Sequence, residues 1–122
     1  MSTQAGIDFE AADNARDARL RYRVLRLLNE CRSIARPGPW IKDILDSAAG
    51  KDRLEDEQHL VKLLIDLDNA GYILVEDKRT RAREDLSLGF IYCSITAEGT
   101  RFVSGAAPPD PLIDDGRIVK RN

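Results

Sequence analysis

The sequence predicts a small α+β domain, and the middle of the chain gives the clearest signals. An apolar helical pattern ends at Gly71, two short runs of strand-forming residues follow, and Thr96 then starts another short helix. A glycine directly after a periodic apolar segment is typical of a helix C-terminus, because glycine adopts the left-handed conformation without strain. Two more helical segments precede this region. We therefore expect the order helix, helix, helix, strand, strand, helix.

The composition is that of one soluble globular domain. Of the 122 residues, 43% are hydrophobic and 33% are charged, which suits a single small core with a polar surface. No run approaches the roughly 20 apolar residues that span a bilayer. The N-terminus lacks the basic and apolar regions of a signal peptide, so we expect a cytoplasmic protein. Cys31 and Cys93 are isolated in apolar stretches, which favours two buried free thiols over a disulfide.

A first helix is predicted to end at Arg36, because the residue before a proline avoids the helical conformation. Its start is open, since Asp8 and Asn14 both have side chains that cap helices. Residues 1–13 are therefore expected to form a flexible or helical arm. The apolar residues that recur at helical spacing and should face the core are Leu20, Val24, Leu27, Leu28, Cys31 and Ile34.

Two further helices are predicted over residues 39–50 and 56–70. Proline is tolerated in the first turn of the former, and Gly50 and Gly71 follow the two helices as caps. The residues expected to face the core are Trp40, Ile41, Ile44 and Leu45 in the second helix, and Leu60, Leu63 or Leu64, and Leu67 in the third.

The rest of the domain is predicted to be a hairpin and a short helix. Residues 72–76 and 88–95 are rich in strand formers. Thr96 is expected to cap the fourth helix, and Glu98 in its first turn complements the helix dipole.

The chain from residue 105 to residue 122 is expected to be a flexible tail. It opens with Gly105-Ala-Ala-Pro-Pro, which suits neither a helix nor a strand. An alternative is that Leu112-Ile113 and Ile118-Val119 add a strand to the sheet edge of a neighbouring chain.

Charge is unevenly distributed along the chain, although the net charge is only −2. Residues 15–36 hold seven arginines against two acids, a local charge of +5. Residues 43–70 hold eight acids against three basic residues, a local charge of −5. The asymmetry restricts which surface can meet an anionic partner.

The motif Ile95-Thr-Ala-Glu-Gly99, following Gly71 and a basic hairpin, resembles the MarR- and ArsR-type winged-helix regulators. In that family a strand runs into a Leu-Thr-x-x-Gly turn that opens the last helix, and here isoleucine replaces the leucine. The resemblance covers residues 18–104. The segment Arg23-Val-Leu-Arg-Leu-Leu28 and the Ala/Gly/Pro-rich tail are also similar to small winged-helix proteins of Mu-like phages and prophages. Both resemblances imply a winged helix-turn-helix domain, which we assign to residues 14–104.

A winged helix implies a third helix that enters the major groove of double-stranded DNA. Counting back from Gly71, its outward positions are Gln58, His59, Lys62 and Asp66. Of these, Gln58, His59 and Lys62 are the predicted DNA contacts, since glutamine reads adenine and lysine binds guanine or a phosphate. Acids on the same element either stabilise the helix through its dipole or weaken phosphate binding. These acids are Glu55, Asp56, Glu57, Asp66 and Asp68.

The hairpin tip supplies a second group of predicted DNA contacts. Four basic residues lie within six positions, and arginines in such a loop can follow the minor groove or its phosphates. Two acids on each side cancel this charge, so a solvated, self-paired loop is the alternative. The basic residues are Lys78, Arg79, Arg81 and Arg83.

The first helix offers a candidate protein interface. Its arginines form a basic ridge that is either solvated or docks on an acidic surface of a partner or of a second copy in a homodimer. Tyr22 and Leu25 lie outside the apolar stripe and would supply apolar anchors. The predicted interface residues are Arg19, Tyr22, Arg23, Leu25 and Arg26.

Motifs for catalysis are absent from the sequence. No Cys-His or Ser-His-Asp pattern and no glycine-rich phosphate loop occurs, so we expect no enzymatic activity and no cofactor. Glu55 and His59 share a helical face and form at most half of a metal site, without a second cluster to complete it. Trp40 is interpreted as a core residue.

Two functional hypotheses follow from the sequence. The first is a dimeric DNA-binding regulator from a phage, a prophage or a bacterium. The alternative is a winged-helix protein-interaction module of a phage or bacterial assembly. In that module the basic first helix and the acidic third helix would make complementary contacts.

Overall fold

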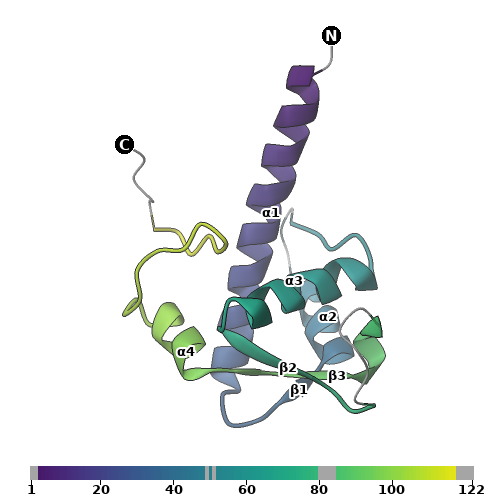
Figure 1. The fold of residues 1–122 in the computed structure, drawn as a ribbon, viewed down its shortest axis with the longest axis vertical. Helices are drawn as coiled ribbons and strands as arrows, with labels where there is room; N and C mark the ends of the chain where they lie inside the picture. The colour runs from purple at the N-terminus through teal and green to yellow at the C-terminus, as the bar shows by residue number, and fades with distance from the viewer. Residues whose placement is uncertain (1–2, 49, 51, 80–84, 118–122) are drawn as a thin grey trace.

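The computed structural model describes residues 3–48, 50, 52–79 and 85–117, with side chains from residue 11 onward. The described residues form α1 (Thr3–Glu30), β1 (Arg36–Pro37), α2 (Gly38–Ser47), α3 (Glu57–Asn69), β2 (Ile73–Asp77), the 3-10 turn η2 (Leu88–Phe90), β3 (Ile91–Ile95) and α4 (Ala97–Val103) (Figure 1). The predicted α+β class is confirmed. Within this part of the chain, no helix has the length and apolar character needed to cross a membrane.

The sheet is antiparallel and has the strand order β1-β3-β2. The sequence predicted β2 and β3 but not β1, which pairs Arg36 with Cys93 and Pro37 with Tyr92. A two-residue strand has no alternation to recognise. A proline inside it also argues against a central strand, and β1 does lie at the margin of the sheet.

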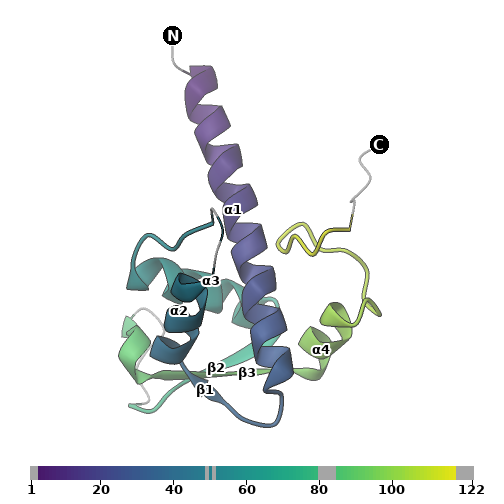
Figure 2. The same cartoon turned by 180° about the vertical axis from the view of Figure 1, so that it is seen from behind.

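Helix α1 is the longest element and runs past the sheet between the other helices. Figure 2 shows it in front, with α2 and α3 on one side and α4 on the other. It ends at Glu30 rather than at Arg36, so Ile34, expected in the core, is 53% exposed. Residues 11–15 are all exposed, and Ala18 is the first of the described side chains to be buried. The N-terminal part of α1 therefore projects from the body (Figure 1).

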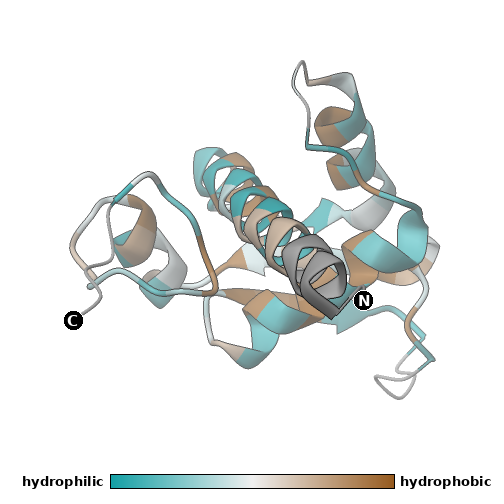
Figure 3. Cartoon of the chain, turned by 90° about the horizontal axis from the view of Figure 1, so that it is seen from above, coloured by the Kyte–Doolittle hydropathy of each residue, from teal (hydrophilic) through white to brown (hydrophobic). Residues whose placement is uncertain are grey.

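One hydrophobic core joins α1 to the other helices and to the inner face of the sheet. Apolar residues line the helix sides that face one another (Figure 3). Leu25 was predicted to face a partner, which is wrong, because its side chain is 0% exposed. Helix α1 contacts α3, α4 and β3 at once, so it buries a face wider than a single stripe.

Helix α3 follows the prediction closely. Asp56 is its N-cap, and Leu60, Leu63, Leu64 and Leu67 are fully buried. In α2, Ile41 and Leu45 are buried as predicted. Trp40 is half-buried beneath the Arg36 guanidinium, 4.8 Å from its ring centroid, and Ile44 is exposed.

The predicted caps around Gly71 and Thr96 are confirmed, and they contact each other. Gly71 has a φ of +89° after α3. The Thr96 hydroxyl accepts a hydrogen bond from Gly99 N and donates one to the Gly71 carbonyl at 2.7 Å. A Cβ on Gly99 would collide with the carbonyl oxygen of Tyr72 and lie 2.7 Å from Ile95 Cγ1. The close approach of α4 to the start of β2 therefore requires a glycine at position 99.

The segment from residue 105 to residue 117 packs against the domain, whereas the sequence predicted a flexible tail there. Ala107 and Ile113 are buried, and Tyr72 donates a 2.6 Å hydrogen bond to the Asp110 carboxylate. Ile113 bridges to Asp110 of the same chain rather than to a neighbour's sheet. Arg117 also donates to the Ala107 carbonyl at 2.7 Å, and the backbone N–H of Asp114 donates to the Ala18 carbonyl of α1 at 3.1 Å. Ile118 and Val119 lie outside the described residues.

Both cysteines are free thiols, as predicted. Cys93 is buried in the sheet, and burial raises the pKa of its thiol to about 12, which keeps the thiol protonated at neutral pH. Cys31, just after α1, is only half-buried.

Replacing Gly99 by alanine is expected to destabilise the fold by about 1–3 kcal/mol, because the methyl group overpacks a closed contact. Urea titration measures this loss as a change in the free energy of unfolding. Gly89 is the matched control, since a Cβ there meets nothing within 4 Å. Gly89→Ala should change stability by less than about 0.5 kcal/mol. Equal effects at the two positions would contradict the close approach at Gly99.

Stability is expected to fall as the pH rises from about 10 to about 12. Burial, and then the hydrogen bond to Asp110, raise the pKa of Tyr72 from 10.0 to about 12. In this window the unfolded chain releases the tyrosine proton and the folded chain keeps it, so rising pH favours unfolding. Urea unfolding across this range should show a shallower decline for Tyr72→Phe than for the wild type. Identical declines would rule out this role of Tyr72.

Candidate functional site

The arginines of α1 are directed at acids of the same chain. Arg16 lies 3.3 Å from Glu55, and Arg21 lies 2.8 Å from Asp66. Arg19 donates two hydrogen bonds, of 2.7 and 2.8 Å, to Asp52. Arginines of the basic first helix therefore form ion pairs with acids in and before α3 of the same chain.

The pair Arg21–Asp66 is the most buried of these contacts. Arg21 is 8% exposed, and its other terminal nitrogen donates to the Leu112 carbonyl at 3.0 Å. Its Nε has no hydrogen-bond partner among the described residues. Asp66 also accepts from Lys62 Nζ at 3.1 Å. Since Arg21 already balances the charge of Asp66, the three side chains together carry one net positive charge, which the exposed Lys62 presents.

The other acids of α3 also have internal uses. Asp56 accepts the backbone N–H of His59 at 2.8 Å as the helix cap, and Asp68 accepts the N–H of Val75 in β2 at 2.7 Å. Glu57 stays exposed in the first turn, where it complements the helix dipole. Asp56 and Asp68 therefore bind backbone N–H groups, while Glu55, Asp56 and Glu57 remain exposed acids at the start of α3.

His59 was predicted to point outward to DNA, which is wrong, because it is buried against α1. Its Nδ1 accepts the backbone N–H of Glu55 at 3.0 Å, and its Nε2 lies 2.8 Å from the Asp17 carboxylate. The proton therefore resides on Nε2, which donates to Asp17. His59 and Asp66 stand two turns apart on the flank of α3 that faces α1. Among the described residues, no three potential metal ligands are grouped together.

The solvent-facing line of α3 consists of uncharged or basic side chains. Gln58, Lys62 and Asn69 are exposed, and Ile65 between them is half-buried. They are spaced by three or four residues, so they share one face of the helix. The side chain of Lys62 is 65% exposed. The sequence analysis did not predict Asn69 as a contact. It lies in the last turn of α3, where the sequence pattern was interpreted only as a helix end capped by Gly71.

The hairpin residues are only partly described. Arg79 lies 3.1 Å from the Asp77 carboxylate and 3.9 Å from the Phe90 ring centroid, which fits the self-paired alternative. Lys78 is exposed, with its Nζ 4.6 Å from the Tyr92 ring centroid. Arg81 and Arg83 lie outside the described residues.

The five residues predicted to form a partner interface on α1 have different surroundings in the structure. Arg19 and Arg23 bind α1 to α2 and to the α2–α3 connection, because Arg19 pairs with Asp52 and Arg23 donates to the carbonyls of Leu45 in α2 at 3.1 Å and of Asp52 at 3.5 Å. Tyr22 is half-buried and Arg26 is exposed, 5.9 Å above the Tyr22 ring. These two residues still face solvent, whereas Leu25 belongs to the core.

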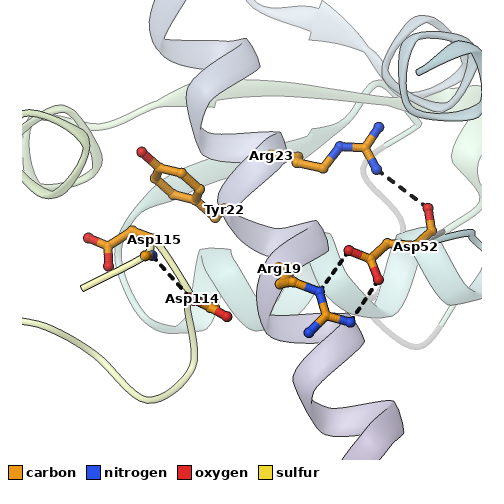
Figure 4. A pocket seen from close by; sticks show the side chains of 7 residues that line it. Arg19, Tyr22, Arg23, Asp52, Asp114 and Asp115 are labelled. Carbon is orange, nitrogen blue, oxygen red and sulfur yellow. Dashed lines mark hydrogen bonds and ion pairs between the residues drawn. The ribbon is translucent and has the colours of Figure 1, made fainter. Parts of the chain in front are cut away.

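An open groove of about 370 Å³ lies along this part of α1 (Figure 4). Its floor is α1 itself, and its two walls are the α2–α3 connection and the C-terminal segment. The lining residues are Arg19, Tyr22, Arg23, Asp52, Asp114, Asp115 and Gly116.

Comparison of this chain with protein-family models, with curated proteins and with solved structures finds no match.

Asp66→Ala is expected to lower the free energy of unfolding by about 3 kcal/mol, because it leaves the Arg21 guanidinium buried without a counter-charge. Lys62→Ala removes the exposed partner of the same carboxylate and should cost less than about 0.5 kcal/mol. Urea titration of both variants separates the two roles. Similar losses of unfolding free energy in the two variants would mean that Asp66 is not needed to balance the buried charge of Arg21.

Proposed function

We propose that this chain is a winged-helix protein without enzymatic activity that binds double-stranded DNA through α3 and the β2–β3 hairpin. The element order and the strand order β1-β3-β2 support this proposal. In such a domain a short first strand joins the hairpin, and the third helix remains free to enter a major groove.

The exposed line of α3 carries the proposal. Gln58 and Asn69 are amides of the kind that read adenine, and Lys62 suits a guanine or a phosphate. Two of the acids that would repel DNA have other partners, since Asp66 balances Arg21 and Asp68 binds the backbone of β2. Glu55 and Glu57 stay exposed at the start of the helix. The line formed by Gln58, Lys62, Ile65 and Asn69 is therefore polar, with one positive charge at Lys62.

The expected contacts divide into two kinds. Gln58 and Asn69 approach base edges, while Lys62 and Lys78 approach phosphates. Two phosphate contacts give a slope of only about −1.8 in log affinity against log salt, so one domain binds weakly. A tethered second domain would raise the apparent affinity through its effective concentration.

A cytoplasmic regulator of phage, prophage or bacterial origin is the setting that we propose. The Ile95-Thr-x-x-Gly99 motif supports it, and so does the arginine-rich first helix. The complementary contacts that the protein-interaction alternative requires between α1 and α3 are made inside one chain, which favours DNA binding over that alternative.

Fluorescence anisotropy with a labelled mixed-sequence duplex tests the proposal. Binding should weaken steadily as salt rises from about 50 to about 200 mM. Lys62→Ala and Lys78→Ala should each weaken binding and reduce the salt slope by about one.

Arg101→Ala on α4 is the matched control. Arg101 is 60% exposed and pairs only with the nearby Glu98 among the described residues, so its loss should leave the salt slope unchanged. Absence of binding at the lowest salt would refute the proposal. Equal slopes in the wild type and both lysine variants would remove α3 and the hairpin from the DNA contact.

A further inference from the structure

His59 is the only histidine of the chain, and it lies where the start of α3 meets α1. Both of its ring nitrogens are engaged. Nδ1 accepts the backbone N–H of Glu55 at 3.0 Å, and Nε2 donates to the Asp17 carboxylate at 2.8 Å. The side chain is only 6% exposed. One neutral ring therefore joins α1 to the segment that leads into α3.

We propose that His59 is a pH-sensitive switch, which holds the start of α3 against α1 at neutral pH and releases it on acidification. Histidine is the side chain whose charge ordinarily changes between about pH 5 and about pH 8. The proton that the ring gains goes to Nδ1, because Nε2 already carries one. Nδ1 then becomes a donor that faces a second donor, the backbone N–H of Glu55.

Protonation of the docked ring has two costs. The hydrogen bond at Nδ1 is lost outright, which leaves the Glu55 N–H without its acceptor in a partly buried place. The new positive charge also lies in the first turn of α3, since Asp56 is the N-cap of this helix and His59 follows three residues later. A cation at a helix N-terminus is disfavoured by the helix dipole. Both costs disappear when the ring leaves its site.

Charged side chains from two elements face the ring. From α1, Asp17 lies 2.8 Å and Arg16 Nη2 lies 3.5 Å from Nε2. From the α2–α3 connection, Glu55 pairs with Arg16 at 3.3 Å, and Asp56 accepts the backbone N–H of His59. Asp17 favours a charged ring, but Arg16 lies 3.2 Å from the same carboxylate and balances it. The bond from Nε2 to Asp17 also exists before the ring gains a proton, so the lost contact at Nδ1 decides the sign, and acid favours release.

Release of the ring affects the DNA-facing line of α3. Gln58 directly precedes His59 and is exposed on that line. A released first turn no longer holds this amide in place, so duplex binding should weaken as the pH falls. A ring that only added positive charge would strengthen binding instead, because phosphates attract cations. This consequence rests on the proposed DNA binding, whereas the switch itself does not.

Urea unfolding between about pH 7.5 and about pH 5.5 tests the switch without DNA, because histidine titrates in this range and carboxylates ordinarily titrate below it. The unfolded chain takes up a proton that the docked ring does not, so stability falls as the pH falls. The equilibrium constant of unfolding should rise by up to about tenfold per pH unit once the ring titrates. Nitrogen NMR of the ring should show Nδ1 unprotonated at the neutral end of the range.

His59→Asn is the matched control. The Oδ1 of asparagine is as many bonds from the backbone as Nδ1 of histidine, and it accepts the Glu55 N–H without titrating. This variant loses the bond to Asp17 and should be less stable at neutral pH, but its stability should not change across the range. Asp17→Asn keeps an acceptor for Nε2 and removes the charge that favours a protonated ring. Its loss of stability on acidification should therefore exceed that of the wild type.

Three results would overturn the switch: a protonated Nδ1 at neutral pH, the same pH dependence in the wild type and in His59→Asn, or a stability that rises on acidification. Anisotropy of the labelled duplex over the same pH range tests the consequence for DNA. Weaker binding at low pH in the wild type but not in His59→Asn would support it. A duplex that never binds would refute the proposed function, while the urea and NMR measurements still decide the switch.

Discussion

The ion pair between Arg21 and Asp66 is the contact on which the arrangement of the helices depends. A buried guanidinium tolerates few positions for its counter-charge, because an unpaired charge in the interior is costly. Arg21 also binds the carbonyl of Leu112, so one side chain fixes α1, α3 and the C-terminal segment relative to one another. The same pair neutralises Asp66 and thereby sets the charge of the exposed face of α3.

The charge pattern of a sequence is therefore a poor guide to the charge of a surface. The local excess of arginine in α1 and of acid around α3 look like two patches for outside partners. In the fold, Arg16, Arg19 and Arg21 meet acids of that segment, so these arginines are paired within the chain rather than gathered in a free basic patch. Under the proposed DNA binding, electrostatic steering would be correspondingly weak and specificity would rest on polar side chains such as Gln58.

The sequence predicted correctly those elements that depend on residues close together in the chain. Helix α3, its buried leucines and the cap at Thr96 depend on periodicity and on nearby side chains, which the sequence displays directly. Strand β1 depends on pairing with a distant strand, and the inward turn of His59 depends on where α1 passes. Leu25 was misplaced for the same reason, since a helix packed on several sides buries more than one stripe. In the candidate site, Gln58 and Lys62 lie on the exposed face of α3 as predicted. Asn69 lies on the same face but was not predicted, because its position suggested only a helix end.

The contact between Asp68 and the N–H of Val75 has a consequence for the behaviour of the protein at high concentration. An outer strand with an unpaired N–H group is a template on which another chain can add its own strand, and repeated addition leads to aggregation. The carboxylate of Asp68 occupies that donor at 2.7 Å in the middle of β2. Asp68, which the sequence places in an acidic cluster, therefore removes one edge donor to which another chain could add a strand.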